Sequence, residues 1–250
     1  MRHRLPFVPF LLLATAACSY PRFAATKTVE FELAADGVQR IACETHNGPI
    51  TIVGEVGIGV IRLHAEITAR AASQADADAL LARLDVRRDL QDGRLTVAGI
   101  APSDVGWSQS TAFAFRITAP PAVAAATDSH NGALQVTGVD GAVDAETHNG
   151  DVTVTAATAE LRATTHNGDL HVVLDGAVRD VAVETHNGEV ALELRAPSGA
   201  EVEVATHNGS IRRGERVVTI DEGRRSFRGR VGEGKGKVRV TTHNGDVLVR

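Results

Sequence analysis

The chain has 250 residues and a formal net charge of −5, with 43% hydrophobic and 23% charged residues. This composition is that of a folded protein and excludes a disordered chain. Aromatic residues make up only 4%. Their scarcity and the acidic balance argue against nucleic acid as a partner. Two cysteines allow at most one disulfide, and a core of small and β-branched residues favours thin β-layers.

The N-terminus has the features of a lipoprotein signal. A basic start precedes an apolar stretch over residues 5–17 that is too short to span a membrane. The Ala-Ala-Cys sequence ending at Cys18 resembles the lipobox of bacterial lipoproteins, although Thr15 stands where leucine is commonest. The resemblance implies cleavage before Cys18 and lipid attachment to it; a plain secretory signal is the alternative. We predict a signal peptide over 1–17 and a tether over 18–28.

The interval that follows the first copy of a repeated motif has a different pattern from the rest of the chain. A Ser73 N-cap and a spaced apolar face predict a short helix near 73–90, ended by Asp92-Gly93, that covers an end or flank of a sheet. Strands are predicted around this helix, near 50–53, 60–69, 94–99 and 113–119.

The repeated motif is the strongest feature of the chain. Thr-His-Asn-Gly occurs six times and Ser-His-Asn-Gly once, and these copies hold seven of the ten histidines. Successive motif histidines are 84, 18, 18, 20, 21 and 36 residues apart. The copies begin at Thr45, Ser129, Thr147, Thr165, Thr185, Thr206 and Thr242. Such regular spacing indicates a repeat architecture. The longest interval between tandem copies, before the last one, is rich in Gly and Arg and predicts a hairpin or a coil without the motif.

Alternating apolar and polar residues flank each motif, as in 143–147 and 151–154. This alternation predicts half-buried strands, and Asn-Gly permits the positive φ of a sharp corner. A stack of hairpins and a solenoid both fit, but the solenoid also explains the constant period. We predict an all-β, solenoid-like stack of 18–21-residue coils over 29–250. The predicted corners are Asn47, Gly48, Asn131, Gly132, Asn149, Gly150, Asn167, Gly168, Asn187, Gly188, Asn208, Gly209, Asn244 and Gly245.

The alternation also assigns the motif side chains to faces. If Val143 and Ala145 point inward, Thr147 points inward and His148 outward. Stacked coils then form an inner Thr/Ser column, an outer His column and a ladder of Asn amides. Hydrogen bonding of the buried hydroxyls and of the amides is a sufficient structural reason for the motif.

Three features of the chain together resemble a known family. They are the motif series in alternating strands, the Ala119-Pro120-Pro121 step before the first tandem copy, and the Gly-rich segment before the last. They resemble the bacterial "putative adhesin" family of β-strand-repeat proteins, a domain of unknown function, over about residues 29–250. The resemblance implies a β-solenoid-like envelope protein without established catalysis. It carries no catalytic or binding residues to this chain.

The outward histidines are the main candidates for chemistry. Five lie in near-consecutive coils, about 4.8 Å apart: His130, His148, His166, His186 and His207. We expect His46 and His243 to be the end members of the column. Two neighbouring imidazoles could share a divalent transition metal, helped by a carboxylate such as Asp151, Asp169 or Glu189. A purely structural stack and a pH sensor are the alternatives, and no other cofactor is expected.

Two further features have simpler explanations. Cys43 lies on the inward column and is predicted to be a small buried hydrophobic residue. Seven arginines between residues 212 and 230 form a basic patch. It is either a solvated hairpin face or a site for an anionic partner such as lipopolysaccharide, phospholipid or polysaccharide.

These observations predict a non-catalytic, lipid-anchored protein of the cell envelope that acts as a structural, adhesive or interaction module. A metal- or ligand-binding lipoprotein using the His column is the first alternative. A carbohydrate-active solenoid enzyme is less favoured, because lysines and aromatic residues are few. The expected partners are the membrane, through the N-terminal lipid, and envelope polysaccharide or another envelope protein. The chain would face the periplasm or the exterior, and Ser19 predicts an outer membrane in a cell that has one.

Overall fold

The computed structural model describes residues 22–195, 199–233 and 235–250. The predicted signal peptide and Cys18 lie outside the described residues. Within these ranges the chain forms 21 β-strands and one α-helix, so the predicted all-β class is confirmed. No helix in the described ranges is long and apolar enough to cross a membrane.

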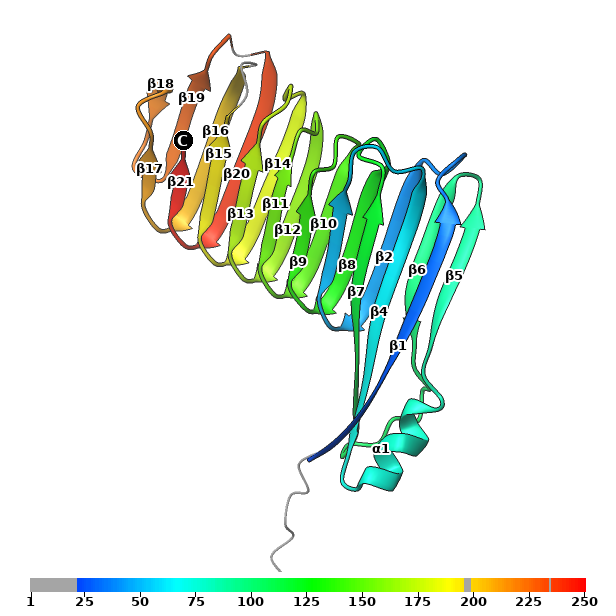
Figure 1. Ribbon diagram of the computed structural model, residues 1–250. Coiled ribbons are helices and arrows are strands. Elements are labelled where there is room, and N and C mark those ends of the chain that lie inside the picture. Colours follow the sequence, from blue (N-terminus) through cyan, green and yellow to red (C-terminus); the bar gives the residue numbers. More distant parts are fainter. Residues whose placement is uncertain (1–21, 196–198, 234) are drawn as a thin grey trace, which may run out of the picture.

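The strands form two open sheets that pack face to face (Figure 1). The ten-stranded sheet has the order β1-β4-β7-β3-β9-β11-β13-β15-β21-β17. Its strands are β1 (Phe23–Ala34), β3 (Ile50–Gly54), β4 (Val60–Ala71), β7 (Ser110–Ala119), β9 (Leu134–Thr137), β11 (Val152–Ala156), β13 (Leu170–Leu174), β15 (Val190–Leu194), β17 (Ile211–Arg213) and β21 (Val247–Val249). The strands predicted near 50–53, 60–69 and 113–119 are therefore confirmed.

The eleven-stranded sheet has the order β18-β19-β16-β20-β14-β12-β10-β8-β2-β6-β5. Its strands are β2 (Arg40–Asn47), β5 (Asp85–Gln91), β6 (Arg94–Ile100), β8 (Ala124–Asn131), β10 (Val143–Asn149), β12 (Glu160–Asn167), β14 (Asp180–Asn187), β16 (Ala200–Asn208), β18 (Val217–Glu222), β19 (Ser226–Val231) and β20 (Gly236–Asn244). The strand predicted near 94–99 is β6.

Seven coils make up the body of the molecule. Each coil runs along one strand of the eleven-stranded sheet, turns at an Asn-Gly corner and returns along one strand of the ten-stranded sheet. Neighbouring coils pair in parallel with the motifs in register, so Thr147 lies beside both Ser129 and Thr165. This parallel pairing confirms the solenoid and excludes the stack of hairpins.

The side chains take the faces that the alternation predicts. Ala145, Val152 and Val154 are fully buried between the sheets. Thr147 is also buried and points inward, whereas His148 is exposed. The core therefore consists of small aliphatic residues from both sheets, closed at one corner by a column of hydroxyls.

The order of the coils in space differs from their order in the chain. Strand β20 pairs with β14 on one side and with β16 on the other, and β21 likewise lies between β15 and β17. Figure 1 shows the red C-terminal coil between yellow and orange strands. The expectation that the last motif ends the stack is therefore wrong. The β18–β19 hairpin, which confirms the predicted hairpin, covers β16 on its outer side and lets the chain return on the inner side.

The other end of the stack is closed by antiparallel strands. Strands β6 and β7 continue the parallel sheets, and β5, β4 and β1 then pair antiparallel. Strand β1 begins at Phe23, so it includes residues 23–28 of the segment predicted as a tether. These strands cover the edges that the first coil would otherwise expose.

The helix is shorter than the sequence suggests. Helix α1 (Gln74–Leu81) begins at the predicted N-cap, where the Ser73 hydroxyl accepts from the Asp76 N–H, and it packs against β1 and β4. It ends at Leu81, so its predicted extension to residue 90 is wrong, and strand β5 follows. Asp92 and Gly93 have φ values of 48° and 76° and form a two-residue hairpin turn to β6, not a helix end.

Candidate functional site

The inward hydroxyls connect each coil to its neighbour. Thr165 Oγ1 donates to Gly150 O at 2.9 Å, and Thr185 Oγ1 donates to Gly168 O at 3.1 Å. The same bond recurs from Ser129, Thr147, Thr206 and Thr242. The buried column is thus satisfied by corner carbonyls, as a buried hydroxyl must be.

The asparagines form a continuous amide ladder. In the spatial order 47, 131, 149, 167, 187, 244, 208, each Nδ2 donates to the Oδ1 of the preceding asparagine at 2.7–2.9 Å. At the first coil, Asn47 Nδ2 donates instead to Thr111 O. An interior asparagine therefore makes two ladder bonds, whereas Asn208 at the far end makes one.

The corner glycines are required by the close approach of the coils. A Cβ on Gly168 would lie 2.1 Å from Gly150 O, and one on Gly245 would lie 1.9 Å from Gly188 O. Gly48 has a φ of 125°, but Gly168 and Gly188 do not have positive φ. The prediction of positive φ at every corner is therefore wrong, and it is the neighbouring carbonyl that leaves no room for a side chain.

Seven histidines stack on the outer side of the same corner; we call them the histidine ladder. Ring centroids are 4.7–4.9 Å apart and neighbouring planes lie within 8° of parallel. The spatial order is His46, His130, His148, His166, His186, His243 and His207. The five predicted members are all present, but His243 separates His186 from His207. His207, not His243, is therefore the end member.

The ring orientation bears on the predicted metal site. The lone pairs of imidazole lie in the ring plane, so parallel stacked rings direct them side by side and not toward a shared ion. Among the described residues, no three His, Cys, Asp or Glu side chains are placed to hold a metal ion. Two of the carboxylates proposed to help, Asp151 and Asp169, instead accept the backbone N–H of the next corner at 2.9 and 2.8 Å.

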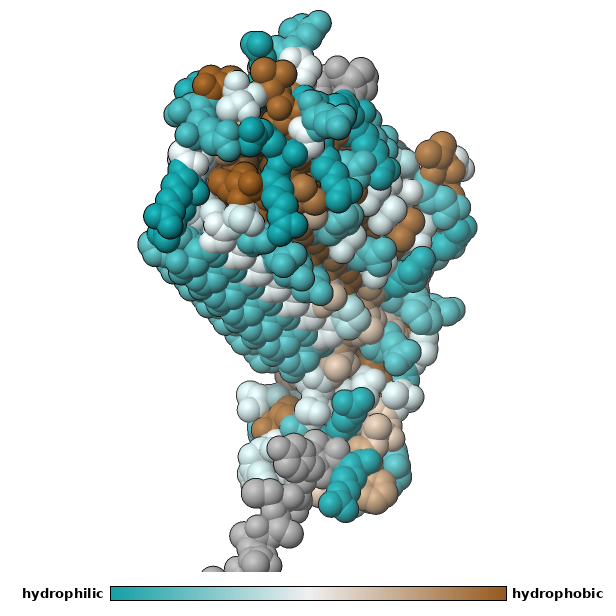
Figure 2. Space-filling view, turned by 90° about the vertical axis from the view of Figure 1, so that its left-hand side faces the viewer, coloured by the Kyte–Doolittle hydropathy of each residue, from teal (hydrophilic) through white to brown (hydrophobic). Residues whose placement is uncertain are grey.

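A groove of about 860 Å³ runs beside the histidine ladder over six coils. The histidines form one wall of the groove, and the residues two positions before each histidine form the other. These wall residues are Asp128, Glu146, Thr164, Glu184, Thr241 and Ala205. The motif Ser and Thr residues lie between the two walls and form the floor. Figure 2 shows this corner as straight parallel rows of hydrophilic side chains. The groove was not predicted from the sequence. The acidic residue that directly precedes the motif in several copies was the available signal for its carboxylate wall.

Two titratable groups at this corner have pKa values that differ from their ordinary values. Loss of water contact, together with repulsion by Glu44 and Asp144, raises the pKa of Asp128 above its ordinary value, and His130 partly opposes the effect. Partial desolvation and the charges of His207 and His186 hold the pKa of His243 below its ordinary value. The pKa of Asp128, on the groove wall, and that of His243, in the histidine ladder, are therefore both affected by neighbouring coils.

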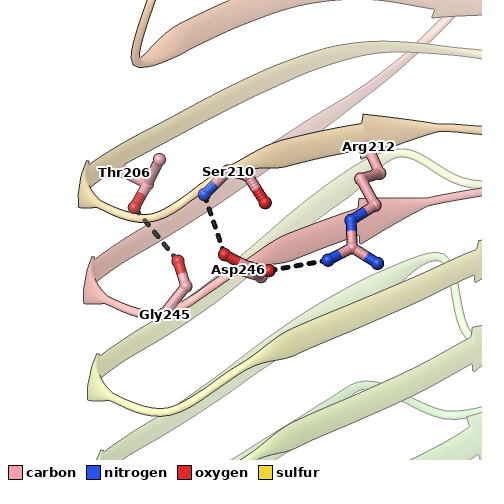
Figure 3. A network of polar contacts seen from close by, with 5 residues as sticks. All are labelled: Thr206, Ser210, Arg212, Gly245 and Asp246. Carbon is pink, nitrogen blue, oxygen red and sulfur yellow. Dashed lines mark hydrogen bonds and ion pairs between the residues drawn. The ribbon is translucent and has the colours of Figure 1, made fainter.

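Most of the other candidates have structural roles. Cys43 is buried and free, and burial raises the pKa of its thiol, as expected of a core residue. Within the arginine-rich segment, Arg212 pairs with Asp246 across the last two coils (Figure 3). Arg213 pairs with Glu222 and Arg228 with Glu201. These pairs neutralise part of the predicted basic patch.

Comparison with known proteins places the chain among proteins of the same fold. A family model described as Toastrack DUF4097 matches residues 20–250. A putative cell adhesion protein from Clostridium sporogenes ATCC 15579 shares 13% identity with a TM-score of 0.52, and the match covers 90% of this chain and 99% of that one. A putative adhesin from Bacteroides fragilis NCTC 9343 shares 13% identity with a TM-score of 0.45, over 90% and 97%. No curated protein matches the chain.

Proposed function

The chain belongs to the Toastrack DUF4097 family, and on that premise we propose that it is a non-catalytic, lipid-anchored adhesive module of the cell envelope. Its contacts would be with envelope polysaccharide or another envelope protein. The observation that carries the proposal is the straight corner of seven coils. There, hydroxyl hydrogen bonds, amide hydrogen bonds and stacked imidazole rings connect each coil to the next. Such a corner presents a long surface whose shape does not depend on a ligand. A solved structure with this fold, that from Clostridium sporogenes, is described as a putative cell adhesion protein, which supports the adhesive role.

The anchor is proposed at Cys18. This residue lies five positions before the start of β1, and five extended residues span at most about 18 Å. A lipid at Cys18 would thus hold the domain close to the membrane. The start of β1 lies beside α1 (Figure 1), so the end of the molecule that carries α1 would face the lipid and the motif coils would extend away from it.

Fractionation tests the anchor. The Cys18→Ala chain should leave the membrane fraction, whereas the conservative change Cys43→Ala in the core should leave the distribution unaltered. Recovery of Cys18→Ala in the membrane fraction would rule out the lipid anchor.

A cell-binding assay tests the adhesive role. Cells that display the chain should be retained on surfaces coated with envelope extract more than matched cells that lack it. Equal retention of the two cell types would contradict the proposal.

Metal binding by the histidine ladder is the alternative function. Isothermal titration of the mature chain with Zn²⁺, Ni²⁺ and Cu²⁺ distinguishes it. A stoichiometric metal site that His166→Asn abolishes would replace the adhesive proposal. We expect no measurable binding of these ions, because the stacked rings would have to rearrange to bind one.

A further inference from the structure

The charged side chains that line the groove wall are all carboxylates. Some outward carboxylates of the same sheet, away from the groove, pair with arginines. These pairs are Glu160–Arg179, Glu201–Arg228 and Glu203–Arg239. In contrast, Asp128, Glu146 and Glu184 of the groove wall form no ion pair with any described residue, and no Lys or Arg lines the groove.

The carboxylate wall faces the histidine ladder across the groove. Each neutral imidazole has one acceptor nitrogen and one N–H donor, and the rings repeat every 4.7–4.9 Å. A ligand in the groove would therefore meet negative charge on one side and uncharged imidazoles on the other. The carboxylate wall favours a cationic ligand and disfavours an anionic one.

We propose that this groove binds an extended, lysine-bearing segment of another polypeptide. The inference rests on the proposed role as an interaction module and specifies its partner. An extended chain advances about 3.3 Å per residue, so about seven residues cover the five ladder steps of the groove. Side chains alternate along such a segment, so lysines at every second position face the carboxylate wall.

The groove is open along its whole length, which allows a chain to lie down sideways without threading. Its carboxylates are exposed, so each ammonium–carboxylate pair is weak and the attraction depends on several pairs acting together. Binding should weaken with added salt, because charges at an exposed surface are screened.

The experiment uses acetyl-heptalysine-amide as the probe and isothermal titration at low ionic strength. The groove variant is Glu146→Gln/Glu184→Gln. The matched control is Glu55→Gln/Glu66→Gln, which removes the same charge from exposed positions outside the groove. All four side chains are exposed, so both variants should unfold at the wild-type denaturant concentration, and this measurement establishes that they are folded.

The proposal expects heptalysine to bind the wild type and the control equally, with about tenfold weaker binding to the groove variant. Acetyl-heptaglutamate-amide should not bind. Equal weakening in both variants would show non-specific attraction to an acidic protein and overturn the proposal, as would an absence of binding. Tight binding of spermine with no gain for the peptide would assign the groove to small polyamines instead. Cell retention in the assay above tests the adhesive role separately, and can persist if the groove fails.

Discussion

The two corners of the same coil differ in the regularity of their length and in the groups that connect neighbouring coils. At the Asn-Gly corner exactly two residues separate the paired strands in all seven coils, and three columns of side chains connect the coils. At the return corner the connecting segments vary, with three residues at 157–159 and five at 175–179. There, the buried Thr158 hydroxyl donates within its own corner, to Glu160 O. The first corner is connected to neighbouring coils by side chains, whereas the second is connected to them by backbone hydrogen bonds such as Asp175 N–H to Ala156 O and Arg179 N–H to Ala159 O.

This difference explains the uneven period of the motif. Strands β11 and β13 have the same length, as do β12 and β14, so the change from 18 to 20 residues between motif histidines comes from the return corner alone. An insertion at the return corner alters one loop. An insertion at the Asn-Gly corner would displace a hydroxyl, an amide and a ring from three ladders at once.

The largest expected effect comes from filling an Asn-Gly corner. Gly168→Val and Gly245→Val each place side-chain atoms against a carbonyl of the adjacent coil, and each should cost about 3 kcal/mol or more of unfolding free energy. Ala177→Val, at an exposed return-corner position, should change it by less than about 0.5 kcal/mol. Urea denaturation measures all three.

The corner glycine at the end of the stack should behave like the interior ones. A Cβ on Gly209, at the end of the stack, would lie 1.9 Å from Gly245 O, so Gly209→Val should cost about as much as Gly168→Val and Gly245→Val. A loss at these glycines no larger than that of Ala177→Val would contradict the close approach of the coils at the Asn-Gly corner.

A smaller effect is expected from breaking the amide ladder. Asn167→Leu removes two ladder hydrogen bonds, and Asn208→Leu at the end of the ladder removes one. At about 1 kcal/mol per bond, the losses should be about 2 and 1 kcal/mol. Thermal or urea unfolding of the two variants compares them directly. Equal losses would show that the ladder bonds do not contribute independently.

The smallest effect is electrostatic and concerns His243. Its pKa is lower in the folded chain than the ordinary value of about 6.5. Near that value the unfolded chain therefore binds more protons than the folded one. The contribution of His243 to stability is complete above the unfolded pKa and declines as the pH falls through it.

An NMR titration tests this coupling. His207→Asn removes one of the two neighbouring charges and should raise the pKa of His243, whereas His64→Asn, on the distant strand β4, should leave it unaltered. An unchanged pKa in His207→Asn would mean that the rings do not interact.

The sequence alone was enough to predict the coil and its faces. The spacing of the motif and the alternation around Thr147 predicted parallel coils, inward hydroxyls, outward rings and an asparagine ladder. These features follow from local rules, because side chains alternate along any strand and identical residues align when coils stack in register. The helix was predicted with the right start and the wrong end, since Asp92-Gly93 suits both a helix stop and a hairpin turn.

Only the tertiary structure decided which coil lies beside which. Strands β14, β16 and β20 have the same alternation and the same motif, so each could pair with either of the others, and nothing local to the last motif shows that it lies between two earlier coils. The choice depends on the β18–β19 hairpin, which occupies the outer edge of β16 and leaves the inner edge to β20. The groove is likewise a property of the stack, because its walls consist of residues from six coils that come together only when every register is set.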